Sequence, residues 1–346
     1  MDFVISGTHI SPFYLMGIGF IVGILGGFFG VGGSFLAGPA LFAMGMPMNF
    51  VVGTDLAHIV GKSIVAARRH RTLGNVDIKL GMIMTTGTIA GVETGAQIIQ
   101  YLKHRADVDK VVAIGFILVL ISISAFIGWE SWQTLKMRRK RDNGKTAVPG
   151  ATRNPVQDQV VTSRFRRYIK KRSEARQQKK DESVISHIPK KIQRFSLPPM
   201  ISLPNCGINR ISLWMILGVA YIGGVFSGFL GGGAGYIRMP AMVYLLGVPT
   251  HLAIGTDLFE IIISASYGTL THAIKGNVDI LVALVMHTGA AVGAQIGASL
   301  TAYFHGTRIR LAFVPLPLIG AGLVVYSLLT GHHLKKGLSD DEDTIL

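Results

Sequence analysis

The chain has 346 residues, of which 49% are hydrophobic and only 15% are charged, and its formal net charge is +15. A soluble domain carries about 25% charged residues, so this composition excludes an ordinary soluble protein. The charge is also confined, because residues 136–210 hold 20 Lys or Arg against 5 Asp or Glu, while the remainder holds 14 of each. The chain is therefore an almost uncharged apolar body that carries one basic segment.

Several apolar runs are long enough to cross a bilayer, which takes about 20 residues. They are 12–33, 50–67, 78–102, 111–132, 211–230, 252–274, 280–304 and 311–329. Two shorter runs, 35–46 and 237–246, suit re-entrant or broken helices. The sequence thus predicts an all-α polytopic membrane protein with about eight transmembrane helices. No Lys or Arg precedes the first run, and we expect no secretory signal peptide.

A glycine-rich stretch, 26–34, joins the first long run to the first short one, and 227–235 does the same later in the chain. Dense glycine allows the backbone to turn and uncovers peptide N–H groups. If short helices begin at Phe35 and Ile237, their N-termini would favour an oxyanion. Close helix packing through small residues is the alternative. The candidate substrate ligands in these turns are Gly30, Gly32, Gly33, Gly231, Gly232 and Gly233.

The two halves of the chain match at a shift of 202 positions. The motif Gly-Thr-Asp-Leu at 53–56 returns at 255–258, and Gly-Asn-Val-Asp-Ile at 74–78 returns at 276–280. Chance similarity between apolar chains would not keep polar and glycine positions in one order, so the sequence indicates a duplication. Such repeats are typical of transporters, whose site lies where the repeats meet. We expect a first membrane repeat at 1–135, a basic cytoplasmic linker at 136–210, a second repeat at 211–333 and a cytoplasmic tail at 334–346.

The basic residues that follow the run ending at 132 predict that this end is cytoplasmic. Counting four crossings and one re-entrant piece in each half places both termini in the cytoplasm and makes the repeats parallel. The loop 103–110 disagrees, because it would carry three basic residues outside. If the short pieces cross as half-helices, each half has five crossings and the repeats are inverted. The linker itself is predicted to be a solvated segment drawn to anionic lipid headgroups, since its few aromatic residues argue against nucleic-acid binding.

Arg238 is the sharpest candidate ligand, because a charge inside an apolar run is costly and usually functional. Its guanidinium can grip an oxyanion with paired N–H groups; snorkelling to headgroups is the alternative. Asp55, His58 and Lys62 share one helical face by their spacing. Lys62 is a second candidate anion contact, and His58 is a candidate proton carrier.

In the second half, the same face carries Asp257 and Glu260, with Glu260 at the position equivalent to His58. Glu260 and Glu93 are further candidate proton carriers. Thr54 and Thr256 precede the two aspartates and complete the candidate substrate ligands. Helix capping is a strong alternative interpretation of Asp55 and Asp257.

No His, Cys, Asp or Glu set has the spacing of a metal site, and the glycine turns lack the Gly-Lys-Ser/Thr ending of a nucleotide-binding loop. We therefore expect no metal and no cofactor. No nucleophile and base appear in motif form, so an enzyme is not expected. The single cysteine, Cys206, excludes an internal disulfide and is interpreted as a bystander thiol.

The Gly-Phe-Phe-Gly-Val-Gly-Gly turn at 27–33, the proline after it, and the Gly-Thr-Asp and Gly-Asn-Val-Asp motifs resemble the TauE/SafE family of membrane permeases. The resemblance covers roughly 12–133 and 211–330 and leaves out the basic linker. It departs from the family pattern at the second turn, which reads Gly-Gly-Gly-Ala-Gly and is followed by Arg238.

The resemblance implies a carrier of sulfite or an organosulfonate in the inner membrane, and alternating access around the two turns is expected. A passive anion channel and a membrane-tethered sensor that acts through the linker are the alternatives.

Overall fold

The computed structural model describes residues 2–3, 5–103, 108–143 and 197–342 and is almost entirely helical. The first half comprises β1 (Asp2–Phe3), β2 (Thr8–His9), α1 (Pro12–Phe29), α2 (Ser34–Ala43), α3 (Met48–Thr72), α4 (Ile78–Lys103) and α5 (Val108–Asn143). The second half begins with β3 (Met200–Leu203), η1 (Pro204–Cys206), β4 (Ile208–Ser212), α8 (Leu213–Leu230), η2 (Gly232–Ala234), α9 (Gly235–Ala241) and η3 (Met242–Leu246). It ends with α10 (Thr250–Ile274), α11 (Ile280–Leu300), η4 (Thr301–Tyr303), α12 (Gly306–Phe313) and α13 (Pro315–Glu342).

Six segments of the described chain are long and apolar enough to span a membrane. They are Pro12–Phe29, Met48–Thr72, Val108–Gln133, Leu213–Leu230, Ile280–Tyr303 and Gly306–Thr330. These six correspond to six of the eight runs that the sequence predicts. The other two runs form α4 and α10, which are at least as long as their counterparts α11 and α3 in the opposite repeat. The chain is thus a polytopic helical membrane protein.

The halves are interlocked, since the first helix of each half packs on the fourth helix of the other. Gly19 and Gly27 of α1 lie against the backbone of Met286 and Ala294 of α11. The residue numbers rise together, so α1 and α11 run parallel, and a Cβ at either glycine would collide with backbone.

The other half repeats this contact between α4 and α8. Gly87 and Gly95 of α4 meet Leu217 and Val225 of α8, again in parallel. Small residues at these positions let the backbones approach closely, so these glycines serve helix packing.

The two repeats run in opposite directions. At the centre, Gly53 near the start of α3 contacts Asn277 after the end of α10, and Gly255 near the start of α10 contacts Asn75 after the end of α3. Therefore α3 and α10 are antiparallel. Arg69, near the end of α3, donates from Nε to the Ser299 hydroxyl at 3.0 Å, and Ser299 lies near the end of α11. Helices α3 and α11 therefore run parallel. Helices α1, α3 and α11 thus run in one direction, and helices α8, α10 and α4 run in the opposite direction. The prediction of parallel repeats is wrong, and the inverted alternative fits.

The short helix accounts for the inversion. Gly33 lies against Val22 of α1, and Met44 shares a hollow with Tyr14, so α2 folds back along α1 and returns the chain to the level at which α1 began. Each half therefore has five segments, of which the second is a short return. After an odd number of passes the second repeat starts from the opposite end of the bundle, so its helices run in the opposite direction to those of the first repeat. After four passes both repeats would start from the same end.

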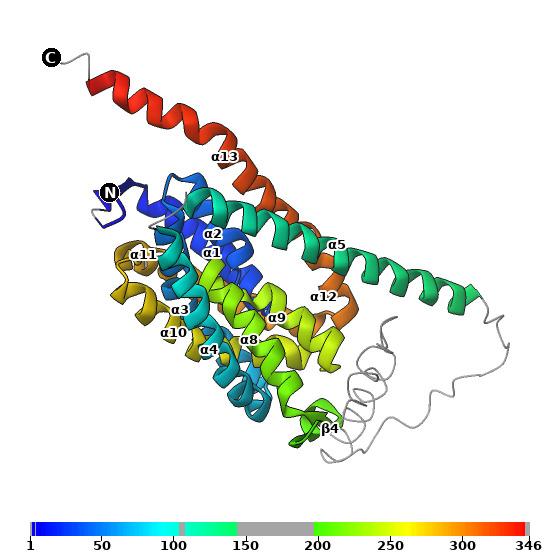
Figure 1. Ribbon diagram of the computed structural model, residues 1–346. Helices are drawn as coiled ribbons and strands as arrows, with labels where there is room; N and C mark the ends of the chain where they lie inside the picture. Colours follow the sequence, from blue (N-terminus) through cyan, green and yellow to red (C-terminus); the bar gives the residue numbers. More distant parts are fainter. Residues whose placement is uncertain (1, 4, 104–107, 144–196, 343–346) are drawn as a thin grey trace.

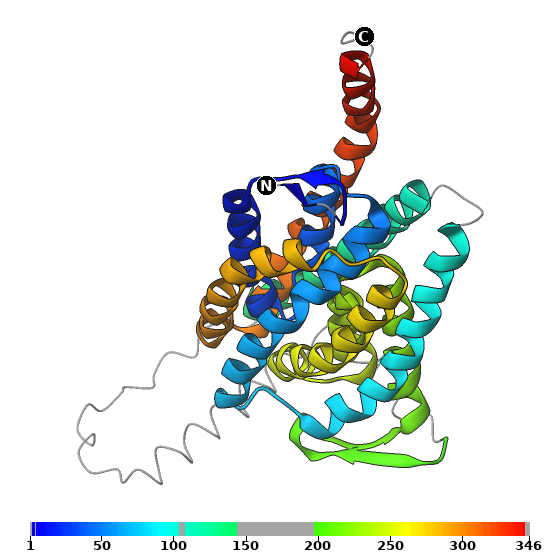
Figure 2. The same ribbon diagram turned by 90° about the vertical axis from the view of Figure 1, so that its left-hand side faces the viewer.

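The two ends of the bundle carry different described segments. Figures 1 and 2 show the first hairpin and the projecting part of α13 at one end and β4 at the other. The Met48 N–H donates to Asp109 at 2.8 Å, so α5 begins beside the start of α3 and runs toward the end at which β4 lies. We name these ends the terminal face and the linker face. The expectation that the end of α5 lies on the same side as the start of α1 and the end of α13 does not fit this arrangement, and the side of the membrane that each end faces stays a prediction. What the sequence predicts for residues 144–196 and 343–346 lies outside the described residues.

Each repeat also begins with a β-hairpin that the sequence did not predict. Strands β1 and β2 pair antiparallel before α1, and β3 pairs antiparallel with β4 before α8. Residues 200–210, which the sequence assigned to the linker, belong to this second hairpin. Strands of two to five residues give little periodic signal, although Ser-Gly at 6–7 and Cys-Gly at 206–207 hint at the match.

Candidate functional site

The two glycine turns meet at the centre of the bundle. Gly30, Gly32 and Gly33 have φ between +68° and +76°, and Gly231, Gly232 and Gly233 have φ between +72° and +82°. L-residues with side chains rarely adopt this left-handed backbone, so the turn geometry alone requires glycine here. The Ser34 hydroxyl donates to the Gly232 carbonyl oxygen, which joins one turn to the other.

Helices α3 and α10 line this junction with buried polar side chains. Asp55, His58 and Lys62 on α3 are 2% exposed or less, and Asp257 and Glu260 on α10 are fully buried. The structure therefore brings together the two predicted helix faces. Asp55 and Asp257 are not helix caps, because α3 begins at Met48 and α10 at Thr250, about two turns earlier.

Arg238 of α9 lies between the two carboxylates of α10. Its Nε donates to Asp257 Oδ1 at 2.9 Å, and its Nη2 forms an ion pair with Glu260 Oε2 at 2.6 Å. The guanidinium is fully buried, so it does not snorkel to the interface. A Cβ on Gly223 of α8 would overlap the Arg238 stem, which explains glycine at that position. In this conformation Arg238 is neutralised by protein carboxylates.

The equivalent cluster on α3 is held more loosely. His58 Nδ1 lies 3.4 Å from Asp55 Oδ1 and 3.3 Å from Lys62 Nζ. Within the described chain, no carboxylate lies within ion-pair distance of Lys62. His287 of α11 packs its ring against Gly61, beside this cluster. Lys62 is therefore a buried cation that the surrounding carboxylates do not neutralise directly.

Several polar atoms in this centre find no hydrogen-bond partner among the described residues. They are Asp55 Oδ2, His58 Nε2, Tyr236 Oη, Arg238 Nη1 and Asp257 Oδ2. Buried polar groups are nearly always paired, so such a concentration points to water, a proton or a ligand. We name Asp55, His58, Lys62, Tyr236, Arg238, Asp257 and Glu260 the central polar cluster.

Tyr236 is the member of the cluster that sequence reasoning missed. It is fully buried on α9, at the position that Phe35 occupies in the first repeat. Its phenol is close enough to Asp55 and Arg238 to interact electrostatically with both. The signal that could have found it was the replacement of Phe by Tyr beside a glycine turn.

Thr54 and Thr256 hold the two repeats together through the Gly-Asn-Val-Asp loops. The Thr54 hydroxyl accepts from the Asp279 N–H at 2.9 Å, and the Thr256 hydroxyl accepts from the Asp77 N–H at 2.9 Å. Each Gly-Thr-Asp motif thus docks on the loop of the opposite repeat. Both motifs therefore have a structural role, because together they join the two repeats.

The two loop aspartates also anchor the hairpins. Ser6 Oγ of the first hairpin donates to Asp279 Oδ2 at 2.7 Å, and Cys206 Sγ of the second donates to Asp77 Oδ2 at 3.4 Å. Burial, with the nearby Asp77 carboxylate, raises the pKa of the Cys206 thiol. Cys206 is therefore a protonated structural donor at the linker face.

Glu93 lies outside the central polar cluster, on the side of α4 that faces α10. Its carboxylate accepts from Gln97 at 3.0 Å and Tyr267 at 3.1 Å, and Lys275 lies 3.4 Å away. The Glu93 side chain is 34% exposed. The structure thus places His58 with Asp55 and Lys62, places Glu260 with Arg238, and separates Glu93 from both sets.

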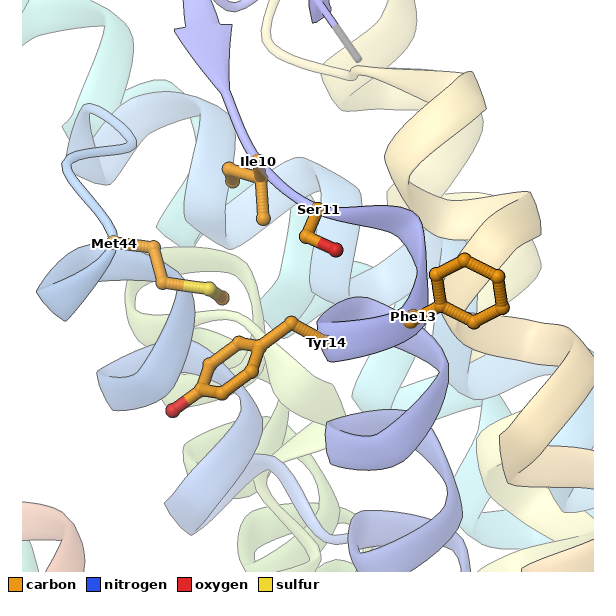
Figure 3. Close-up of a pocket in the computed structure, with 5 residues that line it drawn as sticks. All are labelled: Ile10, Ser11, Phe13, Tyr14 and Met44. Carbon is orange, nitrogen blue, oxygen red and sulfur yellow. The ribbon is translucent and has the colours of Figure 1, made fainter.

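No group of three or more His, Cys, Asp or Glu side chains in the described part of the chain is arranged to hold a metal ion. A hollow on the terminal face is lined by Ile10, Ser11, Phe13, Tyr14 and Met44 and lacks charged side chains (Figure 3). It is formed by the start of α1 and the end of α2, away from the central polar cluster.

Comparisons with known proteins converge on one group. The family described as "Sulfite exporter TauE/SafE" matches residues 15–324. The "Probable membrane transporter protein YjnA" of Bacillus subtilis is 22% identical over 306 residues, which cover 87% of this chain and 95% of that protein.

Shorter matches are more similar. The "Probable membrane transporter protein YunE" of Bacillus subtilis is 32% identical over 31% of this chain and 40% of its own length. The "Probable membrane transporter protein MJ0441" of Methanocaldococcus jannaschii is 40% identical over 21% of this chain and 29% of its own length. No solved structure matches the chain significantly.

Proposed function

The chain belongs to the sulfite exporter TauE/SafE family, and from this premise we propose that it is a secondary transporter of a small sulfur-containing anion, such as sulfite or an organosulfonate. The site lies between the two repeats, and transport proceeds by alternating access. The membrane potential or the proton gradient supplies the driving force.

The central polar cluster is the observation that carries this proposal. Charged side chains inside a membrane protein are costly and mark substrate or proton paths. Here they gather where two broken segments meet between inverted repeats, an arrangement typical of secondary transporters. The cluster also holds two cations, Lys62 and Arg238, beside side chains that can exchange protons.

The proposed roles follow from the contacts. Lys62 attracts the anion, because no carboxylate pairs with it within the described chain. Arg238 binds the anion when its own carboxylate partners move or are neutralised. The turn N–H groups at Gly32 and Gly233 contribute when the turns separate. His58 and Glu260 carry protons, and Glu93 is a peripheral proton site.

The orientation in the membrane follows from charge. The end of α5 and the end of α3 both carry basic residues and both lie at the linker face. The positive-inside rule therefore places the linker face in the cytoplasm, and the antiparallel repeats then place both termini outside. We propose the cell membrane as the location, with the basic linker close to anionic headgroups.

Uptake into proteoliposomes tests the proposal. Wild-type protein is offered labelled sulfite, sulfate, thiosulfate, sulfoacetate, taurine and methanesulfonate, and is compared with Arg238→Ala and Lys62→Ala. We expect saturable uptake of at least one of these anions and its loss in both variants. If uptake is unchanged in Arg238→Ala, this arginine is not a ligand.

Two further measurements separate the alternatives. Flux that grows linearly with concentration and needs no proton gradient would indicate a passive channel. Transport by a chain that lacks residues 145–195 would exclude a sensor whose function resides in the linker.

A further inference from the structure

We infer that Asp257 and Glu260 occupy, on Arg238, the places that the oxygens of a transported oxyanion take, so that an anion and a proton enter the site together. This inference rests on the proposed function and deepens it, because it assigns the proton that accompanies the anion to Glu260 rather than to His58 or Glu93.

The contacts of the guanidinium carry the first step. A guanidinium binds an oxyanion through neighbouring N–H groups. On Arg238, Nε is bonded to Asp257 at 2.9 Å and Nη2 is paired with Glu260 at 2.6 Å, while Nη1 has no partner among the described residues. An anion that grips Nη1 and Nη2 with two oxygens therefore competes with Glu260 for Nη2.

The second step concerns the electric charge of the buried site. When both carboxylates are ionised, the fully buried group of Arg238, Asp257 and Glu260 carries one positive and two negative charges. A monoanion that entered alone would bring a third negative charge into a site with little water to screen it, which is strongly unfavourable. A hydronium ion gives its proton to the displaced carboxylate, so that one O–H bond breaks in the hydronium ion, one O–H bond forms on the protein, and water is released. The total charge of the site then stays constant.

The contacts also indicate which carboxylate takes the proton. Asp257 accepts a hydrogen bond from Nε, whereas the Glu260 interaction with Nη2 is an ion pair without that hydrogen-bond geometry. Glu260 also has the longer side chain and can swing aside at lower cost. We therefore assign the proton to Glu260.

The groups around Glu260 support this assignment. Tyr236 of α9 interacts electrostatically with Arg238 and with Asp55 of α3, while α4 and α8 contribute Thr88 and Gly223 to the surroundings of Glu260 and Arg238. The free Tyr236 hydroxyl can donate to the anion or accept from protonated Glu260. His58 and Lys62 belong to the first repeat, on α3, whereas Arg238, Asp257 and Glu260 belong to the second.

The experiment measures proton and anion movement together in proteoliposomes. Methanesulfonate and thiosulfate are the probes, because their charges do not change across the neutral pH range, so that pH dependence belongs to the protein. An internal pH dye records protons while labelled anion is counted. For wild type, we expect an inward proton gradient to drive accumulation, one proton to enter with each methanesulfonate, and the half-saturating concentration to rise about tenfold per pH unit above the neutral range.

Glu260→Gln is the decisive variant, because the amide is neutral and cannot take a proton. We expect it to exchange labelled for unlabelled methanesulfonate with no pH dependence, and to lose accumulation driven by the proton gradient. Glu93→Gln is run beside it as the rival proton site, and size-exclusion chromatography checks that both variants are folded. If Glu260→Gln is not folded, the proton-to-anion ratio of the wild type decides.

The outcomes are distinct. Methanesulfonate or thiosulfate uptake by wild type without proton entry overturns this inference and leaves the proposed function standing. Accumulation that persists in Glu260→Gln, or that is lost only in Glu93→Gln, overturns the inference as well. Failure of the wild type to move any anion of the panel overturns the proposed function itself.

Discussion

Arg238 shows how one residue can combine structural and functional demands. Two carboxylates compensate its charge, and all three side chains are fully buried. A buried ion pair rarely adds much net stability, because desolvation offsets the attraction, but removal of one partner leaves an uncompensated charge and costs about 3–5 kcal/mol. Arg238, Asp257 and Glu260 therefore stabilise the fold only while each charged side chain keeps a partner of opposite charge.

We predict that Arg238→Ala lowers the free energy of unfolding by about 3 kcal/mol or more at neutral pH, because Asp257 and Glu260 stay buried without a cation. The loss should shrink as the pH falls, since protonation removes the repulsion that the variant creates. Chemical unfolding in detergent at several pH values measures this.

Lys275→Ala is the matched control, because its ion pair with Glu93 at 3.4 Å joins side chains that are 18% and 34% exposed. We expect it to cost about 1 kcal/mol or less. An Arg238→Ala variant as stable as Lys275→Ala, or one equally destabilised at every pH, would contradict the electrostatic account.

Glycines on α8 provide a second prediction at the residue scale. A Cβ on Gly223 would overlap the Arg238 stem and lie 2.6 Å from Cδ, while Arg238 cannot move aside because both ends of its guanidinium are engaged. We expect Gly223→Ala to cost about 1–3 kcal/mol through overpacking and to reduce anion transport. Thermal unfolding and proteoliposome uptake measure the two effects.

Gly218 lies on the same helix, and no other atom lies within 4 Å of the place that a Cβ would take there. Because alanine is the better helix former by about 0.5–1 kcal/mol, Gly218→Ala should be neutral or slightly stabilising and should transport normally. Equal effects of the two substitutions would show that helix propensity, rather than the Arg238 stem, decides the outcome.

At the scale of elements, the Gly-Thr-Asp and Gly-Asn-Val-Asp motifs explain each other. Each motif looks like an isolated feature in the sequence, yet the threonine of one repeat binds the loop of the other. The duplication made this visible as a repeated pair of motifs. It did not reveal that the threonine of each repeat binds the loop of the other repeat, because an alignment of the two halves does not show which half each motif contacts.

We predict that Thr54→Val and Thr256→Val are destabilising to a similar extent, by about 1–3 kcal/mol, because each leaves a buried backbone N–H without its acceptor. Thr86→Val on α4 is the control, since its exposed hydroxyl bonds only within its own helix, to Ile83 at 2.8 Å. Thermal unfolding of the three variants compares them. Wild-type stability with lost transport would instead favour the predicted role of the two threonines as substrate ligands.

How much the sequence can predict also depends on the scale of the element. Apolar length and glycine spacing predict the long helices and the positions of both turns, because each follows from residues close together in the chain. The pairing of Arg238 with Asp257 and the approach of Tyr236 to Asp55 depend on how α3, α9 and α10 pack. These contacts join residues whose distance in space no local pattern encodes.

For the whole molecule, one short segment decides the topology. The return of α2 along α1, and of α9 along α8, adds a fifth pass to each half, so the second repeat is inverted and α5 ends at the face opposite to the start of α1. The sequence favours four passes, because a run of ten residues is too short to cross a bilayer on its own. Inverted repeats of this kind recur among secondary transporters.

Cysteine labelling from one side of the membrane tests this topology. In a Cys206→Ser background, we place single cysteines by Ile5→Cys, which is 50% exposed at the terminal face, and by Asn209→Cys, which is exposed on β4 at the linker face. We expect a membrane-impermeant maleimide added to intact cells to label the first variant only, and to label the second only after the cells are permeabilised. The native chain should react slowly under both conditions, because burial beside Asp77 raises the pKa of the Cys206 thiol and thiolate is the reactive form. Labelling of both variants from the same side would contradict the inverted repeats, whereas the opposite order of labelling would keep them and reverse the orientation that the positive-inside rule assigns.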